Sequence, residues 1–266
     1  MTKLPLKNEK KISMGSSMVN YRPKPGTMII FPGYVPHEYS VDPGLEPFRF
    51  IHWNIKVVES TISKESSMKK MIQKNKNFFI HKIFPTSILE IENFINKQEC
   101  KDILKKIKQN KKHLKKHLSL IGNASTTYLE QNFLNKLNPL IKSALLEVTK
   151  KYSETTGLEI ENKFAGSWFN IQKKNSALKK HNHPMSVISG IIYIQCDENS
   201  FNTYFYNPNP MLTFTKINKD TESSVDWVAF KPKVGTLLLF PSWLLHGSNF
   251  IKNKCNQRIV ISFNII

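Results

Sequence analysis

Two histidines, His181 and His183, stand one residue apart in the segment KHNHPMSVISGIIYI. An extended backbone points alternate side chains to the same side, so both imidazoles can face one metal ion. A third histidine, His246, follows the apolar segment GTLLLFPSWLLHG, and Arg258 comes twelve residues later. Two close ligands and one distant ligand leave coordination positions open for reactants, and a guanidinium can bind a carboxylate bidentately. These four residues predict a metal centre with a carboxylate-binding arginine beside it.

Short apolar segments bounded by turn residues dominate the chain beyond Glu159, which is typical of β-strands. Strands are predicted near Lys163–Gln172, Val187–Gln195, Thr203–Tyr206, Leu212–Lys216, Asp226–Phe230, Thr236–Phe240 and Arg258–Ile265. The segments VISGIIYI and RIVISFNI are apolar on both faces. We therefore predict that they are central strands, with a cavity on one side and helices packed on the other.

Two amphipathic helices are predicted ahead of these strands. Apolar residues recur at helical spacing from Asn93 to about His117, and a second helix is predicted from about Thr127 to Thr155. Pro139 is expected to kink or break the second helix, and Gly157 to end it. Helices followed by many short strands indicate an α+β or mainly β domain. Trp168, Trp243 and Phe240 are predicted to be core residues, and His81, His113 and His117 to be surface or packing residues.

The amino-terminal part of the chain repeats the segment that carries His246. GTMIIFPGYVPH, ending in His37, matches GTLLLFPSWLLH at one constant offset, and Arg49 follows His37 by twelve residues. The final strand of this copy aligns with the end of the chain only after a slip of one residue. Because His37 is the first histidine in the chain, no paired-histidine strand precedes this copy.

Three regions follow from this repeat. Residues 1–58 are predicted to be the carboxyl-terminal fragment of a first domain, residues 59–77 a polar linker, and residues 78–266 a complete domain. An isolated hairpin is marginally stable in water, so residues 1–58 are expected to pack on the second domain, on a partner chain or on a missing upstream domain. The alternative is that they form an edge hairpin of a single domain.

The composition indicates a globular protein, with 40% hydrophobic and 22% charged residues. No segment is long enough to span a membrane and the amino terminus lacks a signal-peptide core, so a cytoplasmic location is expected, in the host cytoplasm if the chain is phage-encoded. The net charge of +19 is almost entirely lysine, because only Arg22, Arg49 and Arg258 are arginines. A lysine-rich surface of this kind is usually just solvated, so nucleic acid is not the expected partner.

The order of these motifs resembles that of the Fe(II)- and 2-oxoglutarate-dependent oxygenases, and most of all a bacterial and phage subgroup related to prolyl 4-hydroxylases. The resemblance covers residues 78–266, with residues 1–58 similar to the end of a second such domain. It implies a double-stranded β-helix, or jelly roll, with Fe(II), 2-oxoglutarate and O2 as cofactor and co-substrates. It also implies residue roles: His181, His183 and His246 would bind iron, Arg258 would bind the distal carboxylate of 2-oxoglutarate, and Tyr193, Ser262 and Asn170 would assist it.

His183 departs from most of that superfamily, in which an acid occupies this position. We assign it as a ligand; the alternative is that water or Asp197 completes the shell. The expected function is hydroxylation of a C–H bond in a peptide side chain or small molecule, with release of succinate and CO2. Two alternatives remain open: a non-catalytic metal-binding jelly-roll module, possibly associated with a virion, and a nucleic-acid-modifying enzyme of the same superfamily.

Overall fold

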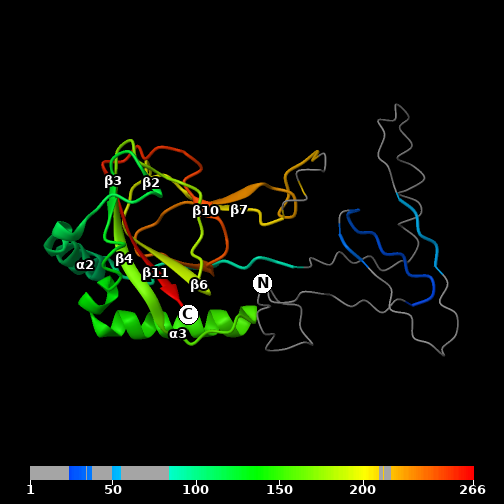
Figure 1. Cartoon of the computed structure of the whole chain (residues 1–266), viewed down its shortest axis with the longest axis horizontal. Coiled ribbons are helices and arrows are strands. Elements are labelled where there is room, and N and C mark those ends of the chain that lie inside the picture. The colour runs from blue at the N-terminus through cyan, green and yellow to red at the C-terminus, as the bar shows by residue number, and fades with distance from the viewer. Residues whose placement is uncertain (1–23, 34, 38–49, 55–83, 210–211, 213–216) are drawn as a thin grey trace. The chain divides into compact units, whose positions relative to one another are not determined.

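The computed structural model describes residues 24–33, 35–37, 50–54, 84–209, 212 and 217–266 (Figure 1). The chain divides into two compact units, one of Asn20–Lys82 and one that joins Met1–Val19 to Ile83–Ile266. Every helix and strand of the described residues lies in the larger unit. The predicted linker, His81 and most of the predicted strand Leu212–Lys216 lie outside the described residues, so these predictions stay untested.

The larger unit is built around a main sheet of six antiparallel strands, in the order β1-β9-β6-β11-β4-β3. Its strands are β1 (Leu89–Ile91), β3 (Ala124–Thr126), β4 (Phe164–Lys173), β6 (Ile188–Gln195), β9 (Leu237–Pro241) and β11 (Gln257–Ile265). A second sheet has the order β10-β7-β8. It consists of β7 (Thr203–Tyr206), β8 (Trp227–Phe230) and β10 (His246–Gly247), and a two-stranded sheet joins β2 (Leu120–Ile121) to β5 (Ala177–Leu178).

One face of the main sheet packs on the helices, as the strand pattern predicts. Ile261 and Phe263 of β11 are fully buried in the larger core cluster, which also holds Ile103 and Leu145 from two helices. Because side chains alternate across a strand, Val260 faces the other way and packs in a second cluster with Phe205 of β7. The second sheet therefore covers the face opposite to the helices, which makes a mainly β fold of two facing sheets with the helices on the outer face of the larger sheet.

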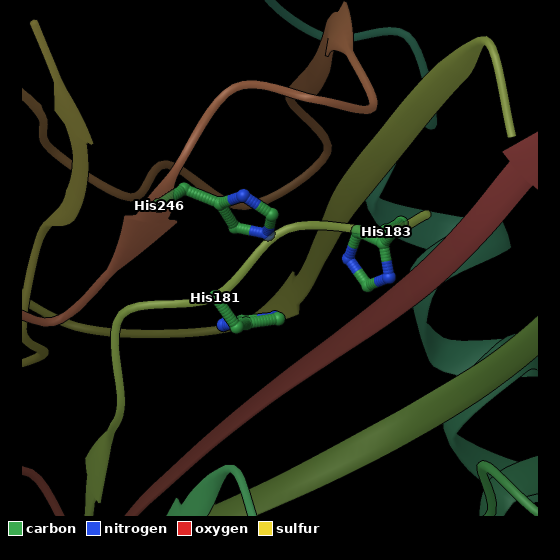
Figure 2. Close-up of side chains that lie close together, drawn as sticks. All are labelled: His181, His183 and His246. Atoms are coloured by element: carbon green, nitrogen blue, oxygen red, sulfur yellow. The ribbon is translucent and has the colours of Figure 1, made fainter. Parts of the chain in front are cut away.

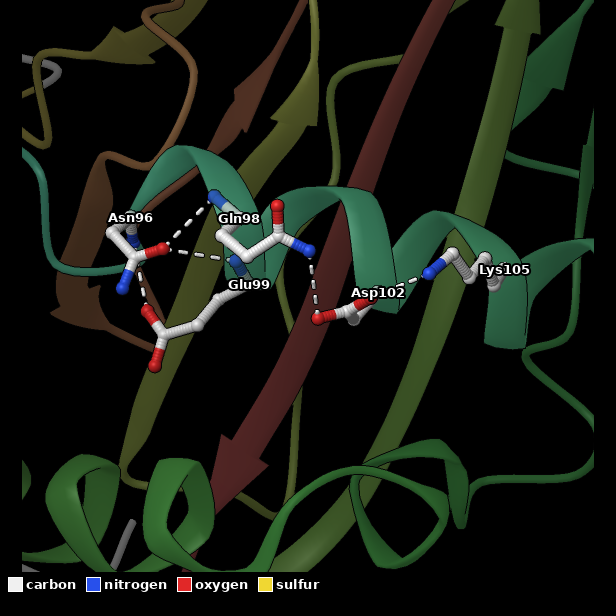
Figure 3. A network of polar contacts seen from close by, with 5 residues as sticks. All are labelled: Asn96, Gln98, Glu99, Asp102 and Lys105. Carbon is white, nitrogen blue, oxygen red and sulfur yellow. Dashed lines mark hydrogen bonds and ion pairs between the residues drawn. The ribbon is translucent and has the colours of Figure 1, made fainter.

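Helix α2 (Lys97–Gln109) begins at a reciprocal cap (Figure 3). The side chain of Asn96 accepts hydrogen bonds from the backbone N–H groups of Gln98 and Glu99, both at 2.9 Å. The Glu99 carboxylate accepts one from the Asn96 N–H at 2.8 Å. The cap satisfies backbone donors that the first helical turn leaves unpaired. The helix therefore begins at Lys97, later than the predicted start at Asn93.

The first predicted helix also ends earlier than expected. Asn110 is the C-cap of α2, and a 3-10 turn, η1 (Lys111–His113), follows it. The apolar periodicity continues past this point in the sequence, but Leu114 is extended. A periodic pattern indicates which side chains are buried, but the residue at which a helix ends depends on its local cap.

Helix α3 (Pro139–Thr156) differs from its prediction at one end. Residues before it form only a short 3-10 turn, η2 (Phe133–Lys136), so the prediction of a helix from Thr127 was wrong. Pro139 occupies the first helical turn after the N-cap Asn138, a position where the missing N–H costs nothing. Gly157 ends the helix with φ of 74°, which confirms the predicted stop.

The aromatic residues predicted to be buried divide into two groups. Trp168 and Phe240 are buried, as predicted, whereas Trp243 is 41% exposed and its assignment to the core was wrong. Trp243 lies beyond the end of β9, where the chain turns towards His246 and no longer follows the sheet.

Among the described residues, no helix is both long enough and apolar enough to cross a bilayer.

Candidate metal centre

Three imidazole side chains converge at one end of the sheets (Figure 2). One potential ligand atom from each of His181, His183 and His246 lies within 4.8 Å of the other two. The ring centroids are 4.3 Å apart for His181 and His246, 5.1 Å for His181 and His183, and 5.2 Å for His183 and His246. The predicted convergence of the three histidines is thus observed, and Asp197 is not part of the cluster.

Backbone hydrogen bonds hold these histidines in place. His181 and His246 form an antiparallel bridge in which each N–H donates to the other carbonyl at 2.9 Å. The N–H of His183 donates to the carbonyl of Ser242 at 2.9 Å, just beyond β9. The H-x-H segment is thereby fixed beside the third histidine, which lies 63 positions after His183 in the sequence.

The hydrogen bonds of two rings define which nitrogen faces the cluster. Nδ1 of His181 contacts the Lys179 carbonyl at 2.8 Å, and Nδ1 of His246 contacts the Leu244 carbonyl at 2.9 Å. A carbonyl can only accept, so in the neutral ring the proton resides on Nδ1 and the lone pair on Nε2. Both rings are therefore in the tautomer that offers Nε2 to a metal, with the backbone as the outer hydrogen-bond partner.

Burial favours the neutral form of all three histidines. Burial lowers the pKa of His183 to about 3, and it lowers the pKa of His181 and of His246 as well. His246 is 2% exposed and packs against the rings of Phe205 and Phe240 at centroid distances of 6.0 and 4.7 Å. Three neutral imidazoles with converging lone pairs form a donor set for a divalent transition metal, and they would repel one another if protonated.

Arg258 is buried on the inner face of β11. It is 2% exposed, and its guanidinium donates to the side-chain oxygens of Gln172 and of Thr203, the latter at 3.1 Å. Among the described residues, no carboxylate forms an ion pair with it, and its Nε–H has no hydrogen-bond partner. A buried cation without a counter-charge is costly, so the geometry favours an anion that approaches this arginine.

The three residues predicted to assist Arg258 lie in two places. The hydroxyl of Tyr193 forms a 2.7 Å hydrogen bond with Thr203, the hydroxyl that also accepts from Arg258. The guanidinium carbon lies 5.1 Å from the centroid of the Tyr193 ring. Asn170 and Ser262 instead form a 3.2 Å hydrogen bond with each other on the neighbouring strands β4 and β11. Their predicted roles in co-substrate binding stay predictions.

Strand β7 connects the arginine to the metal-ligand candidates. Thr203 accepts from Arg258, and Phe205, two residues further on, is the strand partner of His246. Side chains two residues apart in a strand face the same side and are separated by about 7 Å. Thr203, which holds the guanidinium, and Phe205, which pairs with His246, therefore face the same side of β7.

Four residues around the site were not found from the sequence. Gln172 and Thr203 hold the guanidinium, and Trp168, predicted only as core, lies 5.6 Å from the His183 ring. Neither Gln172 nor Thr203 stands out in the sequence, because both residue types are common on exposed strands. His117, predicted to be a surface or packing residue, is close enough to lower the pKa of both His181 and His183.

Comparisons with known proteins agree with this geometry. A protein-family model described as "Putative 2OG-Fe(II) oxygenase" matches residues 166–264. The fold is similar to a Pseudomonas putida prolyl-4-hydroxylase, with 10% identity and a TM-score of 0.50 over 68% of this chain and 92% of that one. It is also similar to a Trichoplax adhaerens prolyl hydroxylase in complex with a hypoxia inducible factor peptide fragment, with 13% identity and a TM-score of 0.50 over 68% and 84%.

A search of curated proteins gives no matching sequence. At identities this low, the structural likeness shows the fold alone, and the family match covers the part of the chain that holds all three histidines and Arg258. Together they confirm the predicted resemblance to Fe(II)- and 2-oxoglutarate-dependent oxygenases and the predicted jelly-roll architecture.

Proposed function

We propose, from the 2OG-Fe(II) oxygenase family match at residues 166–264, that this chain is an Fe(II)- and 2-oxoglutarate-dependent dioxygenase that hydroxylates a C–H bond. Iron bound with 2-oxoglutarate and dioxygen would supply the oxidative decarboxylation to succinate and CO2 that such a reaction needs. The protein residues would bind, orient and shield the reactants.

The observation that carries the proposal is the buried Arg258, which has no carboxylate partner among the described residues. A guanidinium that is 2% exposed and lacks an acidic partner in the described structure fits a site built for an anionic ligand. The planar fork suits a carboxylate, and Gln172 and Thr203 hold it so that Nε still lacks a partner. A distal carboxylate of 2-oxoglutarate would supply both the missing charge and the missing acceptor.

The three imidazoles would hold the metal through nitrogen, with Nε2 as the donor in His181 and His246. His183 in place of an acid removes one negative charge from the ligand set, so a bound Fe(II) would keep its full formal charge. This favours an anionic co-substrate as the charge-balancing ligand, and it is expected to alter metal preference and redox potential compared with a site that contains a carboxylate.

Tyr193 and Thr203 would act as positioning residues for the co-substrate. Tyr193 is fully buried, and its hydroxyl is joined to Arg258 through Thr203. This network fixes the guanidinium before a ligand arrives, which reduces the entropy cost of binding. A peptide or protein side chain is the proposed substrate, because of the similarity to prolyl 4-hydroxylases; a small molecule is the alternative.

The test is succinate formation by purified protein supplied with Fe(II), 2-oxoglutarate and oxygen. Turnover is expected in the wild-type protein, to be lost in Arg258→Ala and to be retained in Arg49→Ala. The second variant removes the same residue type and charge at the repeated position of the sequence, so it controls for general charge effects. Equal turnover in both variants would contradict the assignment of Arg258.

A second candidate function is a metal-binding jelly-roll module without turnover. It is favoured by the composition of the cluster, in which no carboxylate joins the three histidines among the described residues. Such a module would bind a divalent metal with the same three imidazoles yet form no succinate. Stoichiometric metal binding together with an absence of succinate would therefore select it over the dioxygenase.

A further inference from the structure

The smaller unit contains a segment that repeats residues 235–246, which end in the candidate metal ligand His246, in conformation as well as in sequence. Gly26 has φ of 79°, and Gly235, at the matching position, has φ of 83°. The next residue in each copy closes the same turn, with Thr27 N–H donating to the Lys24 carbonyl at 3.0 Å and Thr236 N–H donating to Lys233 at 3.2 Å. Two copies of one motif thus begin with the same turn.

The match extends to the histidine. Nδ1 of His37 contacts the carbonyl of Val35 at 3.0 Å, as Nδ1 of His246 contacts the carbonyl two residues before it at 2.9 Å. The ring of Phe31 lies 4.6 Å from His37 at an interplanar angle of 59°, and the corresponding values for Phe240 and His246 are 4.7 Å and 62°. His37 is therefore held in the same tautomer and against the same aromatic ring as a candidate metal ligand.

A second imidazole lies beside it. The ring of His52 is 5.6 Å from that of His37, close to the 5.1 and 5.2 Å that separate His183 from the other two rings of the larger unit. We call residues 24–33, 35–37 and 50–54 the N-terminal copy. It thus offers two imidazoles at the spacing of the candidate metal centre.

The N-terminal copy differs from its counterpart in burial. Leu237, Leu238 and Leu239 of β9 are all fully buried, whereas the matching Met28 and Ile30 are 66% and 72% exposed. Burying an aliphatic side chain of this size is worth about 1.5–3 kcal/mol. The same apolar pattern is therefore covered in one unit and uncovered in the other.

Sheet order shows which strand separates the two repeated segments in the larger unit. In the main sheet β6 lies between β9 and β11, so the two segments that the N-terminal copy repeats are not neighbours but pair with opposite edges of a third strand. The β6 of this chain is hydrogen-bonded along both edges already. Among the described residues, no strand of this type, apolar on both faces and preceded by metal-binding side chains, is left to pair with the N-terminal copy.

We propose that the N-terminal copy is one part of a second divalent-metal site, with His37 as a ligand, and that a second polypeptide completes it by adding a β6-type strand. Addition of a strand to unpaired backbone groups is an established mode of peptide recognition. The proposal does not depend on turnover by the larger unit. It can therefore fail while the proposed dioxygenase function stands, and the dioxygenase function can fail while this proposal stands.

The test uses the 266-residue protein and a synthetic peptide with the sequence of residues 179–195. This peptide is the strand that fits between segments of this type in the main sheet. Its binding is followed by fluorescence anisotropy, and its location by hydrogen–deuterium exchange. We expect protection of residues 27–32 on binding, and an affinity at least about tenfold weaker in Ile30→Asp.

Leu129→Asp is the matched control, because Leu129 is 73% exposed, as Ile30 is 72% exposed, but lies in the larger unit. Its affinity for the peptide should equal that of the wild-type protein. Both substitutions are at exposed positions, so loss of folding does not explain a difference between them. Absence of protection at residues 27–32 with saturating peptide, or equal affinities in the two variants, would overturn the proposed strand addition.

The metal part is measured as bound Zn(II) per chain, with and without the peptide. One additional ion is expected when the peptide is present, and His37→Ala should abolish it while peptide binding persists. His113→Ala removes a histidine outside both sites and should leave the additional ion in place. An additional ion that survives His37→Ala, or none in the wild-type protein, would overturn the assignment of His37 as a ligand.

Discussion

Replacing Arg258 with methionine should separate its role in ligand binding from its role in folding. The substitution removes a buried charge and fills most of the same volume with apolar atoms. Two hydrogen bonds from the guanidinium, to Gln172 and Thr203, are lost, at about 1.5–3 kcal/mol each. The cost of burying an unpaired ion, several kcal/mol, is lost as well. These contributions oppose each other, so the free energy of unfolding without co-substrate should change by less than about 2 kcal/mol.

Binding of 2-oxoglutarate should respond very differently. Removing one partner of a buried charge pair costs about 3–5 kcal/mol, so the Kd should rise by roughly 10² to almost 10⁴-fold. At a co-substrate concentration of about 100 Kd, the wild-type protein gains roughly 2.7 kcal/mol of stability, which corresponds to about 5–10 °C in Tm for a domain of this size. Arg258→Met should show almost none of this increase.

The assay is thermal unfolding with Mn(II) in place of Fe(II), with and without 2-oxoglutarate. Arg258→Lys is an informative comparison, because it keeps the charge and loses the planar fork, and its shift should be intermediate. A full 2-oxoglutarate shift in Arg258→Met would refute the argument that Arg258 binds the carboxylate. Destabilisation of the ligand-free variant by more than about 4 kcal/mol would show that the arginine is needed for folding instead.

Three further predictions concern the cluster and the scaffold. Burial lowers the folded-state pKa of His183 (to about 3) and of His246, so unfolding of the metal-free protein takes up protons. Its stability should therefore fall as the pH drops below about 6.5, by up to about 1.4 kcal/mol per pH unit for each histidine. In chemical denaturation, His183→Gln should show a shallower dependence of stability on pH, and an unchanged slope would contradict this prediction. Gly190→Ala should lower the free energy of unfolding by about 1–3 kcal/mol, because a Cβ at this position would meet the ring of Phe263. Urea unfolding measures this change, and an unchanged free energy would mean that the ring can move aside. Asn96→Ala should cost about 1 kcal/mol through loss of the helix cap, whereas Asn96→Asp should restore most of it in the same assay.

Several elements could be predicted closely because their signal is local. The strand at Thr203–Tyr206 has the predicted bounds, and Gly157 ends α3 as predicted, since a left-handed C-cap depends on one residue type. The start of α3 could not be read in this way. Pro139 breaks a helix when it is internal and begins one when it follows a cap, and the pattern of apolar residues alone did not distinguish the two.

The site shows the same division. Two histidines one residue apart, a histidine at a strand end and an arginine in a chain that otherwise uses lysine could be identified from residue types and spacing. The partners of Arg258 could not, because Gln172 and Thr203 come from strands distant in sequence, and either residue type is common on an exposed strand. Asn170 and Ser262 were predicted from the resemblance to assist Arg258; the structure places them on neighbouring strands, hydrogen-bonded to each other, and their role stays a prediction.

The sequence by itself determined the chemistry available to this protein: three imidazoles, one unusual arginine, and a repeated copy of the strand that carries one of the histidines. Only the tertiary structure decided that the imidazoles converge and that the arginine is buried, with no carboxylate partner in the part of the chain that the structure describes. It also decided that β6 separates the two strands whose sequences are repeated. The physical reason is that residue type and spacing depend on the chain alone, whereas convergence, desolvation and strand order depend on which distant segments pair.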